Sequence, residues 1–257
     1  KKILVPPPPY AHQTDTTNFI TNNLRCLITS DPGTGKTRSV LDAHVQNKCV
    51  TLVLAPLSIL EAAWVDDIIK FQPSINCGVA YAKNRKKIFE STKHDMVITN
   101  FEAVNFLFKN PKYLERFDTL VVDEFTAFKN KDSNRSKHLK ALVKHFDRRI
   151  FMSGTPNTNT ILDLWHPTAC VDDGKRLGLR YYSFRNQVCT SRFNGFANEW
   201  IDKPGIEETV AQMVSDITIR HALEDCIDLP DNVTRTLYTD LTPAVQKMYK
   251  TLQDSSR

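Results

Sequence analysis

The sequence predicts an α/β domain in which helices cover both faces of a parallel sheet. Three observations lead to this fold class. Short apolar runs alternate with helical patterns between residues 24 and 156, a glycine-containing loop joins the first run to the first helix, and a later run ends on two adjacent carboxylates. Strands that alternate with helices of this length are typical of βαβ units, which build parallel sheets. We therefore predict one α/β domain over residues 24–156.

The expected strands are short, apolar and rich in β-branched residues, as strands buried on both faces are. They cover residues 24–29, 50–55, 77–81, 96–99, 119–122 and 149–152. The expected helices lie between them, at residues 36–46, 59–71, 84–91, 101–108 and 133–145. In the second helix, Leu60, Trp64, Ile68 and Phe71 recur at helical spacing. This stripe predicts core packing, and we favour that role over base stacking for Trp64 and Phe71.

The remaining segments follow a different pattern. Residues 1–23 form an N-terminal lead-in whose four consecutive prolines favour an extended conformation. After residue 156, short helical pieces at residues 161–165, 181–187 and 206–215 are separated by glycine-containing turn signals. We expect residues 157–257 to form a helical, loop-rich C-terminal extension.

The loop from Ser30 to Thr37 reads Ser-Asp-Pro-Gly-Thr-Gly-Lys-Thr and precedes the first helix. Its two glycines let backbone N–H groups close around an anion, and the helix dipole favours negative charge there. In such a cradle Lys36 reaches the β- and γ-phosphates of a nucleotide, and the Thr37 hydroxyl binds Mg²⁺. The common pattern has glycine where Ser30 stands, so a turn that contains Gly-Lys-Thr by chance remains an alternative.

A second acidic motif follows the apolar run at residues 119–122. That run ends in Asp123 and Glu124. Functional sites lie at the carboxyl ends of parallel strands, and buried carboxylates are costly unless they have a partner. Asp123 is placed to hold Mg²⁺ through water, and Glu124 to orient and deprotonate the water that attacks the γ-phosphate. A strand-end pair that only meets solvent is the alternative, which the upstream cradle disfavours.

Composition limits the class of protein. The 257 residues carry a net charge of +5, which is compatible with a polyanionic partner but does not require one. The basic cluster at residues 83–87 fits a solvated helix start at least as well as a phosphate contact. No apolar run approaches the ~20 residues that span a bilayer, so we expect no membrane partner. The six cysteines form no C-x-x-C pair, which argues against zinc or disulfides and favours a reducing, cytoplasmic location, with the nucleus as the alternative.

Taken in order, the motifs resemble those of the first motor domain of superfamily 2 helicases, and more closely the Swi/Snf-type translocases of double-stranded DNA. Residues 31–37 are similar to motif I, and residues 123–130 resemble motif II with the trailing Lys-Asn typical of the Swi/Snf group. Residues 54–58 look like motif Ia, residues 98–102 like motif Ib, and residues 153–156 like motif III. The segment that leads toward a second motor domain is matched by residues 219–220, 229–230 and 241–243.

The resemblance implies a RecA-like fold, ATP and Mg²⁺ as cofactors, and movement along double-stranded DNA, with single-stranded nucleic acid as a further candidate. It implies that Gln13 contacts adenine and that Thr37 and Asp123 hold the metal. The phosphate site would comprise Pro32, Gly33, Thr34, Gly35, Lys36, Thr37 and Arg38. Nucleic-acid contact and coupling would fall to Pro56, Leu57, Ser58, Thr99, Asn100, Phe101, Ser153 and Thr155. For Thr99 and Asn100, capping of the following helix is an equal alternative.

The chain also departs from the pattern. Phe125 and Thr126 stand where motif II commonly has Ala-His, which leaves coupling through that His open. Residues 29–32, which lead into motif I, differ from the common Swi/Snf pattern and suggest a divergent viral or bacterial member. Too few residues follow Thr242 for a second motor domain, so we expect a second RecA-like domain of the full-length chain to supply the arginine finger. Two other classes remain: a P-loop NTPase or kinase that does not act on DNA, and a non-catalytic nucleotide-binding module. The matches to motifs Ia, Ib and III argue against the first, and intact Lys36, Asp123 and Glu124 against the second.

Overall fold

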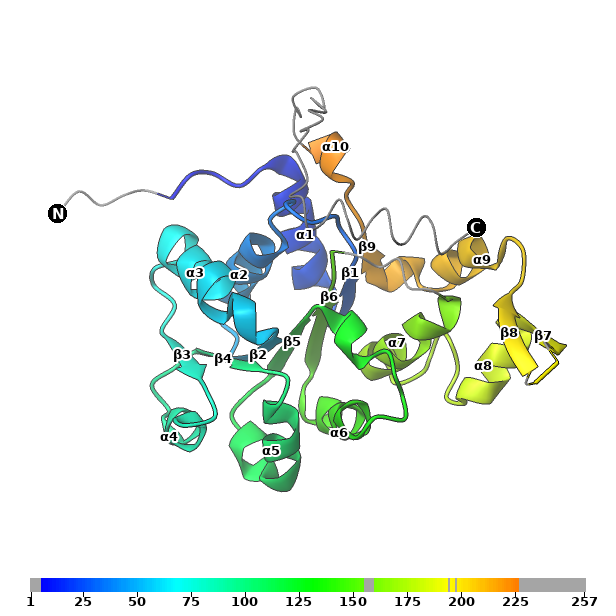
Figure 1. The fold of residues 1–257 in the computed structure, drawn as a ribbon. Coiled ribbons are helices and arrows are strands. Elements are labelled where there is room, and N and C mark those ends of the chain that lie inside the picture. Colours follow the sequence, from blue (N-terminus) through cyan, green and yellow to red (C-terminus); the bar gives the residue numbers. More distant parts are fainter. Residues whose placement is uncertain (1–5, 155–159, 194, 197, 227–257) are drawn as a thin grey trace, which may run out of the picture. The chain divides into compact units, whose positions relative to one another are not determined.

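A computed structural model describes residues 6–154, 160–193, 195–196 and 198–226 of the chain. Its centre is a seven-stranded parallel sheet in the order β3-β4-β2-β5-β6-β1-β9 (Figure 1). The strands are β1 (Arg25–Ile28), β2 (Thr51–Ala55), β3 (Cys77–Ala80), β4 (Met96–Asn100), β5 (Thr119–Asp123), β6 (Arg148–Met152) and β9 (Thr218–Ile219). The six predicted strands are confirmed, and the RecA-like parallel sheet is the fold of this chain.

The register brings the carboxyl ends of the central strands to one edge of the sheet. Asp123 pairs with Met152, and Met152 pairs with Ile28. The loops that leave β5, β6 and β1 therefore begin side by side. This is the edge at which ligands bind in open parallel sheets, because it collects the loops that connect strands to helices.

Helices cover both faces of the sheet, as predicted. One face packs against α1 (Ala11–Asn22), α2 (Lys36–Asn47) and α3 (Asp66–Phe71), with Ile20, Leu41 and Ile68 in a core that includes Val53 and Val121. The other face packs against α4 (Arg85–Glu90), α5 (Ala103–Lys109), α6 (Asn134–Leu142) and α7 (Trp165–Asp172), through a separate core that includes Leu52 and Val122. Neighbouring residues of a strand point to opposite faces, so each central strand contributes to both cores.

Two helical segments differ from expectation. Residues 59–71 were expected to form one α-helix; the chain instead makes a 3-10 turn at Leu57–Ile59, a π-helical turn at Leu60–Val65, and then α3. Helix α1 was not predicted, and its buried residues are Thr16, Thr17 and Ile20. Because two of these three are threonines, the buried face of α1 has no apolar periodicity to detect.

The C-terminal extension contains the predicted helical pieces, two further helices, and strands that were not predicted. The predicted pieces are a 3-10 turn at Ile161–Leu164, α8 (Tyr181–Val188) and α9 (Ile206–Met213), and the further helices are α7 and a short α10 (Leu223–Cys226). The unpredicted features are an antiparallel hairpin of β7 (Cys189–Phe193) and β8 (Asn198–Asp202), and β9, which joins the main sheet beside β1. The boundary at residue 156 stays a prediction, but residues 218–219 belong to the same sheet as the first domain.

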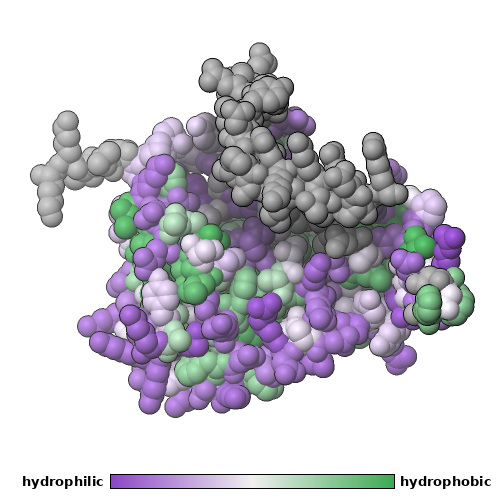
Figure 2. Space-filling model, viewed as in Figure 1, coloured by the Kyte–Doolittle hydropathy of each residue, from purple (hydrophilic) through white to green (hydrophobic). Residues whose placement is uncertain are grey.

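The described surface is mixed in character. Figure 2 shows hydrophobic residues in scattered patches among hydrophilic ones on one face. Within the described ranges, no helix combines the length and the apolar character that crossing a bilayer requires. All six cysteines are free thiols. Burial raises the pKa of Cys26 and of Cys170 to about 12, so these thiols stay protonated and act as small apolar side chains.

Candidate active site

The loop between β1 and α2 has the backbone that an anion cradle requires. Gly33 has φ +84° and Gly35 has φ +79°, both in the left-handed region that residues with a Cβ rarely adopt. Gly35 is also the residue before the first turn of α2. A Cβ on Gly35 would lie 2.2 Å from Nε2 of Gln13, so a larger residue here would displace the Gln13 side chain.

Lys36 is the first residue of α2, and its amine interacts with both the loop and the acidic motif. Its Nζ donates hydrogen bonds to the backbone oxygens of Ser30, at 2.9 Å, and Asp31, at 3.1 Å. Burial lowers the pKa of Lys36, while the charges of Asp123, Glu124 and Asp31 raise it. The amine therefore sits within electrostatic reach of both predicted carboxylates, although they follow it by almost 90 positions in the chain.

Helix α1 brings Gln13 to the same loop. Nε2 of Gln13 donates to the backbone oxygen of Thr34 at 3.3 Å, and Nε2 of His12 lies 2.8 Å from that oxygen. The side-chain oxygen of Gln13 accepts a hydrogen bond from the backbone N–H of Tyr10, whose ring stacks on that of His12. The structure thus places Gln13 beside the cradle, and its contact with adenine stays a prediction.

Asp123 is the last residue of β5, Glu124 follows it, and the two side chains occupy different environments. The Asp123 side chain is buried, and burial raises the pKa of this carboxyl to about 6. A hydrogen bond from Trp64 and the charge of Lys36 oppose this shift, whereas the charge of Glu124 adds to it. Glu124 has φ +55°, a left-handed conformation that is strained for a residue with a Cβ. Strain of this kind concentrates at functional sites, where the surrounding structure maintains it.

The end of β6 completes the site. The hydroxyl of Ser153 donates to Oε2 of Glu124 at 2.8 Å, and its backbone N–H bonds to the oxygen of Ile28 at 3.0 Å. A Cβ on Gly154 would lie 2.9 Å from Cγ of Pro32 and 3.3 Å from Nζ of Lys36, so Gly154 packs directly on the cradle. Ser153 therefore lies beside Glu124 and the phosphate loop, and its role in coupling stays a prediction. Thr155 lies outside the described residues.

Not every predicted phosphate residue points into the cradle. Arg38 is buried, and its Nε lies 2.9 Å and 3.0 Å from the two carboxylate oxygens of Asp42. Its guanidinium also bonds to the backbone oxygen of Pro7 and lies over the ring of Phe71. The Arg38 side chain is thus engaged between α2 and α3. Thr37 is half-buried in the first turn of α2, where its hydroxyl was predicted to bind the metal.

The residues predicted to contact nucleic acid separate into two groups. Leu57 and Ser58 are exposed in the loop that follows β2, and Pro56 is partly exposed there. Thr99 is fully buried and its hydroxyl donates to the backbone oxygen of Ala80 at 2.7 Å, so its side chain faces β3 and not the surface.

The two residues after Thr99 also have partners within the protein. Asn100 is buried and accepts a hydrogen bond from Nη2 of Arg85 at 2.9 Å. Phe101 is half-buried with its ring against Phe128, at 5.0 Å between ring centroids. The alternative role of Thr99 and Asn100 as helix caps is wrong, because the N-cap of α5 is Glu102, without a side-chain cap.

Two contacts at the site were missed by sequence reasoning. Nε1 of Trp64 donates to Oδ2 of Asp123 at 3.0 Å. Trp64 is fully buried, as predicted, but only its amphipathic character signalled that its N–H needs an acceptor. The second contact joins the segment after β9 to the phosphate loop. The backbone N–H of His221 donates to Oγ of Ser30, and the backbone N–H of Leu223 donates to Oδ2 of Asp31.

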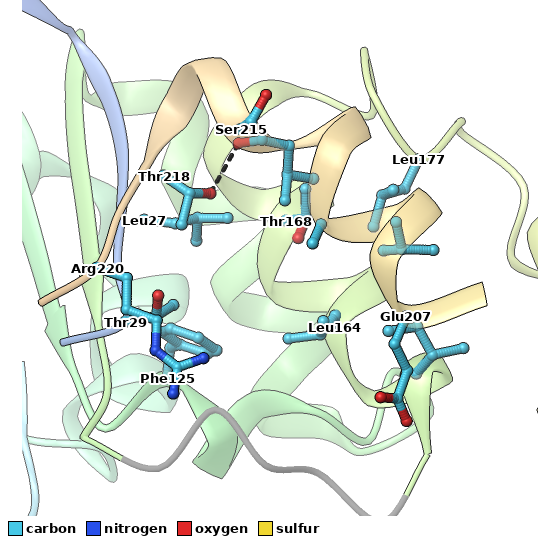
Figure 3. A pocket seen from close by; sticks show the side chains of 14 residues that line it. Leu27, Thr29, Phe125, Leu164, Thr168, Leu177, Glu207, Ser215, Thr218 and Arg220 are labelled. Atoms are coloured by element: carbon cyan, nitrogen blue, oxygen red, sulfur yellow. Dashed lines mark hydrogen bonds between the residues drawn. The ribbon is translucent and has the colours of Figure 1, made fainter. Parts of the chain in front are cut away.

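A cavity of about 420 Å³ lies apart from the cradle (Figure 3). Thr29, Phe125 and Arg220 line one side of it, and Leu164 and Glu207 another, with mostly apolar residues between. Its lining includes none of residues 30–37, Asp123 or Glu124. The residues predicted to carry the chemistry therefore gather at the phosphate loop and do not line this cavity.

Comparison with known proteins gives one family match and several distant relatives. Residues 16–257 match the model of the SNF2-related domain. An uncharacterized ATP-dependent helicase of Mycoplasma pneumoniae is 27% identical over 250 residues, which cover 91% of this chain and 22% of the relative. Putative protein p41 of Acyrthosiphon pisum secondary endosymbiont phage 1 is 25% identical over 266 residues, which cover 96% of this chain and 57% of the relative.

A solved structure supports the fold. The Sulfolobus solfataricus SWI2/SNF2 ATPase core in complex with dsDNA superposes with a TM-score of 0.72 at 24% identity, over 96% of this chain and 52% of that one. The chain thus spans between about a fifth and three fifths of the length of the proteins it matches here.

Proposed function

The chain belongs to the SNF2-related domain family, and from that premise we propose that it is the ATP-binding half of an ATP-dependent motor that moves along double-stranded DNA. The observation that carries this proposal is the convergence of Lys36, Asp123, Glu124 and Ser153 at adjacent strand ends. A helix N-terminus with a half-buried lysine can receive phosphate. Two carboxylates in different environments can then divide the roles of metal ligand and proton acceptor.

The amine of Lys36 can exchange its present hydrogen-bond acceptors for the phosphates of a nucleotide. Its Nζ now donates to two backbone oxygens of the phosphate loop, at 2.9 Å and 3.1 Å. The β- and γ-phosphates of ATP attract the ammonium of Lys36 more strongly than neutral carbonyls do, because they carry full negative charge. We assign to Lys36 the binding of these phosphates.

The residues present fit Mg²⁺. Thr37 and Asp123 offer a hydroxyl and a carboxylate, the oxygen ligands that this ion prefers. The raised pKa of Asp123 is the mark of a buried carboxyl whose charge is only partly compensated, and a cation nearby would stabilise the ionised form. Bound Mg²⁺ would neutralise charge on the phosphates. Glu124, held by Ser153, would orient the attacking water and accept its proton.

A contact surface for DNA is supported at the same edge of the sheet. Lys83, Lys86 and Lys87 are exposed beside Arg85, directly after β3. Arg85 joins this cluster to Asn100, while its buried Nε has no hydrogen-bond partner within the described part of the chain. Together with the exposed loop at residues 56–58, these groups could neutralise backbone phosphates. The DNA-bound Sulfolobus core is consistent with this partner.

We further propose that a second RecA-like domain of the full-length protein completes the site. This chain covers 52% of the Sulfolobus core, which leaves room for such a domain. An arginine finger supplied from outside a nucleotide site accelerates hydrolysis by ~10³–10⁵. The 257 residues alone should therefore bind ATP but hydrolyse it slowly, with little stimulation by DNA.

ATPase assays on this chain and on the full-length protein, with duplex DNA, single-stranded DNA or neither, test the proposal. Duplex-stimulated turnover by the full-length protein is the expected result. ATP turnover that is indifferent to any DNA would favour the P-loop NTPase alternative. Nucleotide binding without turnover in the full-length protein would favour a non-catalytic module.

A further inference from the structure

The indole of Trp64 meets the end of β5 from the π-helical turn. The backbone N–H of Asp66 bonds to the oxygen of Glu61, five residues earlier, which is the wider spacing of a π-helix. Such turns are rare and frequently occur at functional sites. Here the turn lies between the exposed loop at residues 56–58 and α3, and it places Trp64 against Asp123.

The hydrogen bond between Trp64 and Asp123 pairs a group that can only donate with a group that can accept. An indole N–H is a donor and never an acceptor, so Trp64 can face only an acceptor and cannot itself bind a metal. It donates to Oδ2 of Asp123 at 3.0 Å, and both side chains are buried. Because an unpaired buried N–H is costly, this bond persists as long as the ring stays in its core position.

The ring itself is held by packing. Trp64 is part of the core on the α1–α3 face, with Leu60, Ile68 and Val121. Val121 lies two residues before Asp123 on β5 and so points to the same face of the sheet. The orientation of the Asp123 carboxylate is therefore determined by a side chain that tertiary packing immobilises.

We propose that Trp64 is a positioning residue for Asp123, and that its N–H holds one carboxylate oxygen so that the group is preset for Mg²⁺. This inference rests on the proposed assignment of Asp123 to the metal. Groups that hydrogen-bond a ligating side chain orient it, and their loss typically weakens metal binding by roughly 10–100-fold.

Trp64→Phe removes the N–H and keeps an aromatic ring in the core. Trp165→Phe is the matched control, because Trp165 is also buried and donates its Nε1 to the backbone oxygen of Gly178 at 3.1 Å. Binding of Mn²⁺ in the presence of a non-hydrolysable ATP analogue is measured by the electron paramagnetic resonance signal of free Mn²⁺. Binding of the same analogue without metal is measured by calorimetry.

Trp64→Phe should weaken Mn²⁺ binding at least about tenfold and change metal-free nucleotide affinity less than about twofold. Trp165→Phe should leave both unchanged while it lowers the melting temperature comparably. Equal Mn²⁺ affinity in Trp64→Phe and wild type would show that Trp64 only packs, and would overturn the proposal. Wild-type protein that binds no nucleotide in the metal-free arm would instead contradict the proposed function.

Should Trp64→Phe not fold, benzothienylalanine at position 64 replaces the N–H by sulfur and keeps the bicyclic shape. It should reproduce the loss of Mn²⁺ affinity. Wild-type Mn²⁺ affinity in this variant would overturn the proposal in the same way.

Discussion

The hydroxyl of Ser153 donates a hydrogen bond to Oε2 of Glu124 at 2.8 Å, and so links the loop after β6 to the loop after β5. Glu124 has a left-handed backbone, which turns it out of the direction that an extended strand would give it. Ser153 is itself fixed by the bond from its N–H to Ile28 on β1. The proposed base is therefore aligned through a strand that neighbours its own in the sheet.

Ser153→Ala should lower the ATP turnover of the full-length protein roughly tenfold or more, since a hydrogen bond to a charged group contributes about 1.5–3 kcal/mol. Affinity for ATP should stay within about twofold of wild type. Glu124→Gln should bind ATP equally well and turn over about 10²–10⁴-fold more slowly. Steady-state kinetics and calorimetry provide the two readouts. Ser136→Ala is the control, because Ser136 is also buried and donates to the oxygen of Phe128. Wild-type turnover in Ser153→Ala would contradict the assigned alignment.

Lys36→Ala should lower nucleotide affinity at least roughly tenfold, because it removes a charge-assisted contact worth about 1.5–3 kcal/mol. Calorimetric titration with ATP measures the change. Lys203→Ala provides the comparison, since Lys203 also donates to a backbone oxygen, that of Gln187, but lies far along the chain before α9. An unchanged affinity for ATP in Lys36→Ala would contradict the assignment of this loop to phosphate binding.

Replacement of Lys83 and Lys86 by alanine should weaken duplex binding and make it less dependent on salt. Each DNA phosphate that the variant no longer neutralises reduces the slope of log affinity against log salt by about 0.9. Fluorescence anisotropy across a salt series measures both quantities on the full-length protein. The exposed Lys109 and Lys144, replaced together, form a control of equal charge away from the β3–α4 cluster. Equal salt-dependence slopes for the two double variants would show that the basic residues at 83–87 are only a solvent-exposed helix start and do not contact DNA phosphates.

Folding stability should fall on acidification because of His166. Burial, with a smaller effect of the Lys140 charge, lowers the pKa of this buried histidine from 6.5 to about 4. As the pH falls, the unfolded chain binds a proton at this histidine before the folded protein does. The stabilisation that comes from keeping His166 neutral is therefore complete above pH 6.5 and is lost as the pH falls toward 4. Between pH 7 and pH 5 the loss should be roughly 2 kcal/mol from this one group.

Urea unfolding at pH 7, 6 and 5 measures this loss. His166→Met removes the imidazole and should flatten the dependence of stability on pH. Val171→Ala truncates another buried side chain of α7 and should lower stability at every pH while it keeps the wild-type slope. A wild-type slope in His166→Met would assign the effect to other groups.

Much of this protein could be predicted from local patterns. The six central strands and most of the helices that cover them were found because apolar runs and helical spacing reflect which side chains a sheet and a helix bury. The phosphate loop and the two carboxylates at the end of β5 were found for a related reason. Their chemistry resides in consecutive residues, and strand ends of one parallel sheet necessarily meet at one edge.

Contacts between distant segments were decided by tertiary structure alone. A two-residue strand such as β9 has no periodicity, and it exists because β1 offers it an edge. The chain could not indicate that Thr99 would be buried against β3. The left-handed turn at Glu124 and the bond between Trp64 and Asp123 likewise depend on packing across the sheet. Arg38 is different, because Asp42 lies four residues later on the same helix, a local spacing that favours this pair. Sequence determined which groups this site contains, because composition and spacing are local. Their orientation followed from long-range packing, because a side chain turns toward whichever partner the fold brings within reach.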